Sequence, residues 1–170
     1  MNIVEPESQA GVQTILRNPP FLRLWLAQVL SQTAQNSVFY ALMIFVERET
    51  GSSFYMSLLI LTFILPSISL GIAAGVFIDR WNKKTVLVTT NILRVAVVLA
   101  FVLFEQTLGL IYLFNLVFSI ISQFFAPAEL AAIPSVVPKR QLITANGLFN
   151  LTFTASQLAG FVIVAPLLIK

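Results

Sequence analysis

The sequence predicts an all-α membrane protein, a polytopic bundle of about five transmembrane helices. Of its 170 residues, 58% are hydrophobic and 10% are charged, whereas a soluble domain is about half apolar and about a quarter charged. The mean hydropathy is +0.90. The charged residues stand between uncharged runs, and each run approaches the roughly 20 residues that a helix needs to cross a bilayer. A lipid bilayer is therefore the first partner that the composition implies.

Polar and helix-breaking residues divide the chain into a leading segment, residues 1–20, and a transmembrane domain, residues 21–170. In the leading segment, Asn18-Pro19-Pro20 ends any helix before the first apolar run. The predicted spans are residues 21–46, 54–78, 85–104, 110–126 and 142–169.

The loops between the spans carry most of the charge and predict the orientation. We expect a polar turn at residues 47–53, a charged turn at 79–84, and a loop that starts at Pro127 and carries Glu129. Basic residues in short loops are retained on the cytoplasmic side. Those before the first span, after the second and after the fourth are Arg17, Arg23, Arg80, Lys83, Lys84, Lys139 and Arg140. The opposite side has only Arg48 and Lys170, so the N-terminus is predicted to be cytoplasmic.

Polar side chains form stripes at helical spacing on three of the spans. They are Gln28, Gln32 and Gln35 on the first, Asn115, Ser119 and Gln123 on the fourth, and Asn146 and Asn150, continued by Thr154 and Gln157, on the fifth. An unpaired amide in hydrocarbon costs several kcal/mol, so we expect the stripes to share one interior. They either hold the helices together by hydrogen bonds or line a wet cavity for a solute. We favour the cavity, since simple cohesion needs fewer polar groups.

Arg94 is the one charged residue that the sequence places well inside a span. An arginine near the middle of a spanning helix costs at least about 2.5 kcal/mol, so it usually marks a partner or a solute pathway. Its distance from the charged turn, near 15 Å at helical rise, makes snorkelling to the headgroups incomplete. We therefore expect an interior role, with an acidic partner that the sequence leaves open.

Gly71 and Gly75 form a G-x-x-x-G pair on the second span, which allows another helix to approach closely. The pair serves either ordinary helix packing or an interface that moves, and the sequence alone leaves both open.

Several function classes find no support in the sequence. With neither Cys nor His, a metal enzyme or an intramembrane hydrolase lacks its usual groups, and we expect no enzyme activity, no metal and no cofactor. No G-x-x-x-x-G-K-[ST] pattern is present. The basic residues form no face with interleaved aromatics, so nucleic acid is not an expected partner. A channel is a weaker option because no ring of charges or filter-like motif appears.

The charged turn carries a pattern that resembles a known family. Residues 75–84, Gly-Val-Phe-Ile-Asp-Arg-Trp-Asn-Lys-Lys, are similar to the loop signature between the second and third helices of the major facilitator superfamily: Gly, three residues, Asp, Arg, any residue, Gly, basic, basic. Only Asn82 departs, since it stands in place of glycine. Asn tolerates a left-handed backbone better than most residues, so we expect the turn to survive the change.

A second stretch, residues 125–148, resembles the segment after the fourth helix in the exporter branch that includes siderophore exporters and macrolide efflux proteins. The resemblance implies efflux of a small organic solute, drug-like or siderophore-like, across a bacterial inner membrane. It also implies twelve spans in two halves, alternating access, and coupling to protons or another ion. Within the motif, Gly75 is implied to pack against a helix of the other half and Asp79 to sit at the N-terminus of that helix. Arg80, Lys83 and Lys84 are implied to hold the loop at the cytoplasmic face.

The chain departs from the family pattern mainly in length. It reaches Lys170, where the family continues for seven more helices, so we expect a truncated N-terminal part that lacks the C-terminal half. Some relatives carry an acid in the first helix, near Gln35, and this sequence has none there. The rival hypothesis is a membrane fragment that does not transport, or a subunit that needs a separately encoded second half.

Overall fold

The structure, a computed structural model, describes residues 11–104 and 107–168 and is helical throughout, with no strand in those ranges. Its elements are α1 (Val12–Leu16), α2 (Pro19–Thr50), α3 (Ser53–Arg80), α4 (Lys83–Leu103), α5 (Leu108–Val136), η1 (Lys139–Gln141), α6 (Leu142–Val164) and η2 (Ala165–Leu168). Five of the helices are long and apolar enough to cross a membrane. The predicted all-α polytopic bundle is confirmed.

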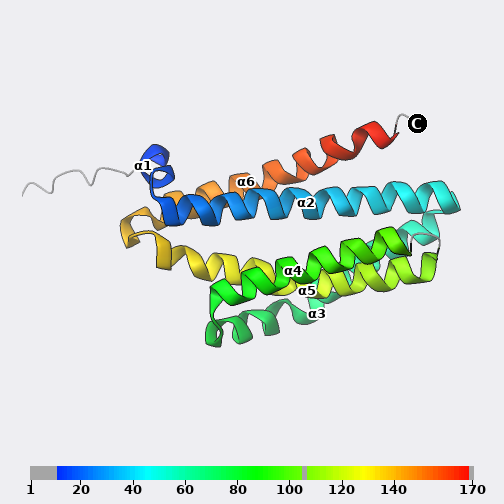
Figure 1. Ribbon diagram of the computed structural model, residues 1–170, viewed down its shortest axis with the longest axis horizontal. Coiled ribbons are helices and arrows are strands. Elements are labelled where there is room, and N and C mark those ends of the chain that lie inside the picture. The colour runs from blue at the N-terminus through cyan, green and yellow to red at the C-terminus, as the bar shows by residue number, and fades with distance from the viewer. Residues whose placement is uncertain (1–10, 105–106, 169–170) are drawn as a thin grey trace, which may run out of the picture.

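The long helices form two groups that lie side by side (Figure 1). α2 packs along α6 in one group, and in the other α5 packs against both α3 and α4. Lighter contacts from α2 to α3 and α5 join the two groups. α2 and α5 each carry one of the predicted polar stripes, and these two helices contact one another where the two groups meet.

Apolar clusters hold the two groups together at both ends of α2. One cluster, around Phe21, Ile133 and Phe149, joins the start of α2 to α5 and α6. Another, around Val46, Leu59 and Ile111, joins the end of α2 to α3 and α5. The amides of Gln28, Gln32 and Gln35 lie between these clusters along α2, so the middle of the bundle is its polar part.

Two predicted loops are helical in the structure. α5 continues through Pro127 and Pro134 to Val136, so the loop expected from Pro127 onward is wrong. Prolines are tolerated in membrane helices because neighbouring helices and side chains satisfy the freed backbone groups. α2 likewise extends through the predicted turn to Thr50, and it ends at Gly51, whose φ of 55° is left-handed. Glycine adopts that conformation without a steric penalty, which makes it the common residue after a helix.

α2 and α6 approach one another closely at Gly160. A Cβ atom there would lie 2.6 Å from Asn36 Cβ and 2.9 Å from the Ser37 backbone nitrogen. Ser37 Oγ also donates a hydrogen bond to the Gly160 carbonyl at 3.4 Å. α2 and α6 can thus pack this closely only because Gly160 has no side chain.

Candidate functional site

The charged turn between α3 and α4 is short because the residue that caps the start of α4, Asn82, follows the end of α3 by only two positions. α3 ends at Arg80, and the Asn82 side chain accepts hydrogen bonds from the backbone nitrogens of Lys84 at 3.0 Å and Thr85 at 3.3 Å. These bonds satisfy two of the four backbone donors that a helix start leaves free. Lys83 Nζ donates to the Asp79 carbonyl at 3.0 Å and so ties the new helix to the last turn of α3.

The Asn82 backbone does not take the left-handed conformation that asparagine tolerates. Its φ and ψ are −69° and 114°, an extended conformation. No non-glycine residue in the described ranges has a positive φ. At the position where the family pattern has glycine, Asn82 therefore acts as the N-terminal cap of α4. Its side-chain oxygen is well suited to this role.

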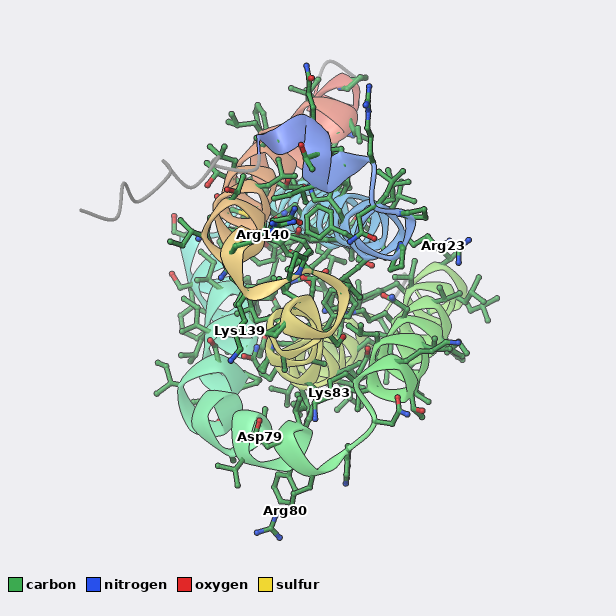
Figure 2. The ribbon with its side chains drawn as sticks, turned by 90° about the vertical axis from the view of Figure 1, so that its left-hand side faces the viewer. Arg23, Asp79, Arg80, Lys83, Lys139 and Arg140 are labelled. Atoms are coloured by element: carbon green, nitrogen blue, oxygen red, sulfur yellow. The ribbon has the colours of Figure 1, made fainter. Side chains whose placement is uncertain are left out.

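The basic residues gather at one end of the bundle. Figure 2 views that end and shows Arg23, Arg80, Lys83, Lys139 and Arg140 spread over it, contributed by segments far apart in the chain. Arg80 points away from the bundle, and Asp79 lies beside it on the last turn of α3. The Asp79 side chain is exposed, so it is accessible to a partner outside the described helices.

The glycine face of α3 has no neighbour among the described residues. A Cβ atom added to Gly71 or to Gly75 would meet no atom within 4 Å. The close helix packing expected at this pair is therefore not made with any described part of the chain.

A cavity of about 250 Å³ lies in the middle of the bundle, where the two groups of helices meet. All five long helices contribute to it. Its lining is Gln32, Gln35, Phe63, Ile64, Ser67, Arg94, Ser122, Gln123, Ala126 and Phe153. The structure thus brings together Gln32, Gln35, Arg94 and Gln123, which the sequence placed on three separate helices.

Arg94 is buried, with 6% of its surface exposed. Its Nε donates to Ser122 Oγ at 3.1 Å, and its guanidinium lies 4.4 Å from the ring centre of Phe125 and 5.8 Å from that of Phe118. Aromatic faces attract a cation, most strongly when both are removed from water. One donor, Nη1, has no hydrogen-bond partner among the described residues.

Glu129 is the buried acid that the sequence analysis missed. Only 3% of its surface is exposed, its charge and that of Arg94 act on one another, and its Oε1 accepts no hydrogen bond from the described residues. Glu129 was placed in a predicted loop and was therefore not considered as a partner of Arg94. Phe118, Ser122, Phe125 and Glu129 follow one another at intervals of four, three and four, which is the spacing of one helix face and was the available signal.

Other predicted residues are used between helices. Asn115 Nδ2 donates to the Leu59 carbonyl at 3.2 Å and to Thr62 Oγ1 at 3.0 Å. Ser119 Oγ donates to the Phe63 carbonyl at 2.6 Å. Both residues thus join α5 to α3 and do not line the cavity.

Gln28 has the same kind of role on the other side of the bundle. Its Nε2 donates to the Phe149 carbonyl at 3.0 Å and joins α2 to α6. The residues of the first stripe therefore have two roles: Gln28 links helices, whereas Gln32 and Gln35 line the cavity.

The stripe on α6 does not share the expected interior. Asn146 and Asn150 are exposed and absent from the cavity lining. The reason is the way α6 packs: it buries the face of Ala145, Phe149 and Thr152 against the bundle, and the two asparagines fall outside that face.

The described residues include no group of three or more His, Cys, Asp or Glu side chains placed to hold a metal ion. The lining of the cavity offers hydrogen bonding by three amides and two hydroxyls, one guanidinium charge, and apolar contact with two aromatic rings. Such a set suits reversible binding of a molecule that has both polar and apolar parts.

Comparison with known proteins agrees with this architecture. The family model described as Major Facilitator Superfamily matches residues 24–170. An uncharacterized MFS-type transporter, YkuC of Bacillus subtilis, is 30% identical over 150 residues, which cover 86% of this chain and 35% of that protein. Macrolide efflux protein A of Streptococcus pyogenes is 28% identical over 131 residues, 75% of this chain and 32% of that protein.

The chain thus spans about a third of the length of these curated relatives. No solved structure matches it significantly. The family match covers α2 from residue 24 onward, the other four long helices, the charged turn and the cavity. The chain belongs to the Major Facilitator Superfamily of membrane transport proteins.

Proposed function

We propose that this chain is the N-terminal part of an exporter that moves a small organic solute out of the cell by alternating access. The observation that carries the proposal is the central cavity, in which Gln32, Gln35, Arg94 and Gln123 from three helices face one space. Because these side chains come from separate helices, small shifts between the helices would change both the cavity and its openings. The efflux named for the streptococcal relative supports the outward direction.

The membrane setting follows from the same reasoning. The gathering of basic residues at one end supports a cytoplasmic N-terminus by the positive-inside rule (Figure 2). The bacterial relatives support a plasma membrane location. A proton or another ion is proposed to drive the transport.

The exposed glycine face supports a second helical half outside the described chain. Gly71 and Gly75 are free for close approach, and Asp79 is exposed at the end of the same helix. A carboxylate at the N-terminus of a facing helix gains about 0.3 to 1 kcal/mol from the helix dipole. That energy biases a conformational equilibrium without locking it.

Transport by the full-length protein, with Asp79→Asn as variant, tests this proposal. The substitution should slow efflux of a fluorescent amphipathic dye from cells with little loss of expression. Glu49→Gln is the matched control, because Glu49 is an exposed acid near the C-terminal end of α2, away from the charged turn. Efflux by this variant should match that of the wild type. Dye efflux no faster than in cells without the gene would contradict the transport function, and unchanged efflux in Asp79→Asn would remove the switch role.

The exposed glycine face also fits a subunit that works with a separately encoded second half. The DNA that follows codon 170 distinguishes the two arrangements. Hydrophobic segments that continue in phase would indicate one longer protein, and an adjacent reading frame with the remaining spans would indicate a split transporter.

A further inference from the structure

The central cavity contains a charge and hydrogen-bonding atoms that the described residues leave open. Arg94 lines the cavity, is 94% buried, and has no hydrogen-bond partner for Nη1. Gln35 lines the same cavity, and its buried Oε1 also has no partner. A buried donor or acceptor without a partner is costly, and more so when it carries charge, so these atoms point to a ligand group that completes them.

No carboxylate is hydrogen-bonded to the open donor of Arg94. Its Nε bonds to the neutral hydroxyl of Ser122, and its flat face lies over Phe125. Glu129 acts on it electrostatically, yet Glu129 Oε1 and Arg94 Nη1 both lack hydrogen-bond partners, so these two atoms are not bonded to one another.

The other charged residues on the helices around the cavity lie toward the helix ends. They are Arg23, Glu47, Arg48 and Glu49 on α2, Asp79 and Arg80 on α3, and Lys83 and Lys84 on α4. α6 has no charged residue in its described length. Arg94 is consequently the one charged residue in the cavity lining. Glu129 is the buried acid that interacts with it electrostatically.

We propose that the cavity binds the anionic group of a solute, a carboxylate or a sulfonate, at Arg94; this deepens the proposed transport function and rests on it. The anion would accept charge-assisted hydrogen bonds from the guanidinium, which are roughly twice as strong as neutral ones. A hydroxyl or amide next to the anion would donate to Gln35 Oε1. The apolar part of the solute would lie against Phe63, Ile64 and Phe153.

The test measures binding without transport. The protein, expressed at the full length of its own gene and placed in phosphatidylcholine nanodiscs, is titrated by calorimetry with naphthalene-2-carboxylate and with its neutral isostere naphthalene-2-carboxamide. The carboxylate should bind about 10-fold or more tightly than the carboxamide. Arg94→Gln should abolish that preference. Lys139→Gln removes an exposed positive charge and should keep the wild-type preference.

Three results would overturn the proposal: equal affinity for the two probes, no measurable binding of the carboxylate at millimolar concentration, or an Arg94→Gln variant that keeps the wild-type preference. Each would mean that water or another protein group is the hydrogen-bond partner of Arg94. If Arg94→Gln does not fold, the comparison of the two probes on the wild-type protein still decides. Dye efflux is measured separately, so a working exporter without carboxylate preference would contradict this inference and leave the proposed function standing.

Discussion

Arg94 Nε and Ser122 Oγ lie 3.1 Å apart and join α4 to α5 beside the central cavity. The same hydroxyl donates to the Phe118 carbonyl at 2.8 Å, so its remaining lone pairs face the guanidinium. A charged side chain in the membrane interior is thus held by one neutral hydrogen bond, aromatic contact and a more distant acid.

Ser122→Ala should destabilise the protein by about 1 to 3 kcal/mol, because it leaves a buried charged donor without a partner. Ser135→Ala is the matched control on the same helix. Ser135 is exposed and bonds only to its own helix, at the Ala132 carbonyl, so its change should stay within about 0.5 kcal/mol. Thermal unfolding of the purified protein in detergent measures both, and equal stability of the two variants would contradict the role of the Arg94–Ser122 bond.

Gly160→Ala should separate α2 from α6. The new Cβ would meet Asn36 and the Ser37 backbone, and overpacking of this kind costs about 1 to 3 kcal/mol. Gly147→Ala, on the same helix, meets no atom within 4 Å and should be neutral or stabilising by up to about 1 kcal/mol. The transition temperatures of the two variants give the comparison, and a Gly160→Ala protein as stable as Gly147→Ala would refute the close approach.

Asn82 should be replaceable by glycine but not by alanine. Loss of the capping oxygen in Asn82→Ala should cost about 0.5 to 2 kcal/mol, whereas glycine at a helix start costs only a few tenths. Asn82→Asp retains an acceptor and should match the wild type. Chemical unfolding in detergent measures the series, and an alanine variant as stable as the aspartate variant would show that the two capping bonds contribute nothing.

The sequence predicted the helical bundle and four members of the cavity because both follow from local patterns. Uncharged runs of membrane length predict spans, and amides at helical spacing predict a polar face. Arg94 stood out because a charge inside such a run is costly. These features depend on the residues of one helix at a time.

Features that depend on packing between helices were not predictable in the same way. Asn115 and Asn146 occupy similar polar stripes, yet one bonds to α3 and the other is exposed, because helix rotation decides which stripe faces inward. Glu129 was assigned to a loop on account of Pro127, although helix α5 runs through both of its prolines. At Asn82, the turn was expected to survive the replacement of the glycine, but the capping of α4 by the asparagine side chain was not predicted.

Access to the cavity from the two sides of the membrane in turn is the central claim, and the lack of cysteine in these 170 residues makes it directly measurable. In the full-length protein, with any cysteine outside these residues replaced by serine, Gln123→Cys places a single thiol in the cavity lining. A small membrane-impermeant methanethiosulfonate should label it from one side of sealed vesicles, and solute with the coupling gradient should move the labelling to the other side. Leu99→Cys, on an exposed apolar face of α4, is the control and should stay unlabelled in lipid. A Gln123→Cys thiol that is unlabelled from both sides, or labelled equally from both at once, would contradict the account.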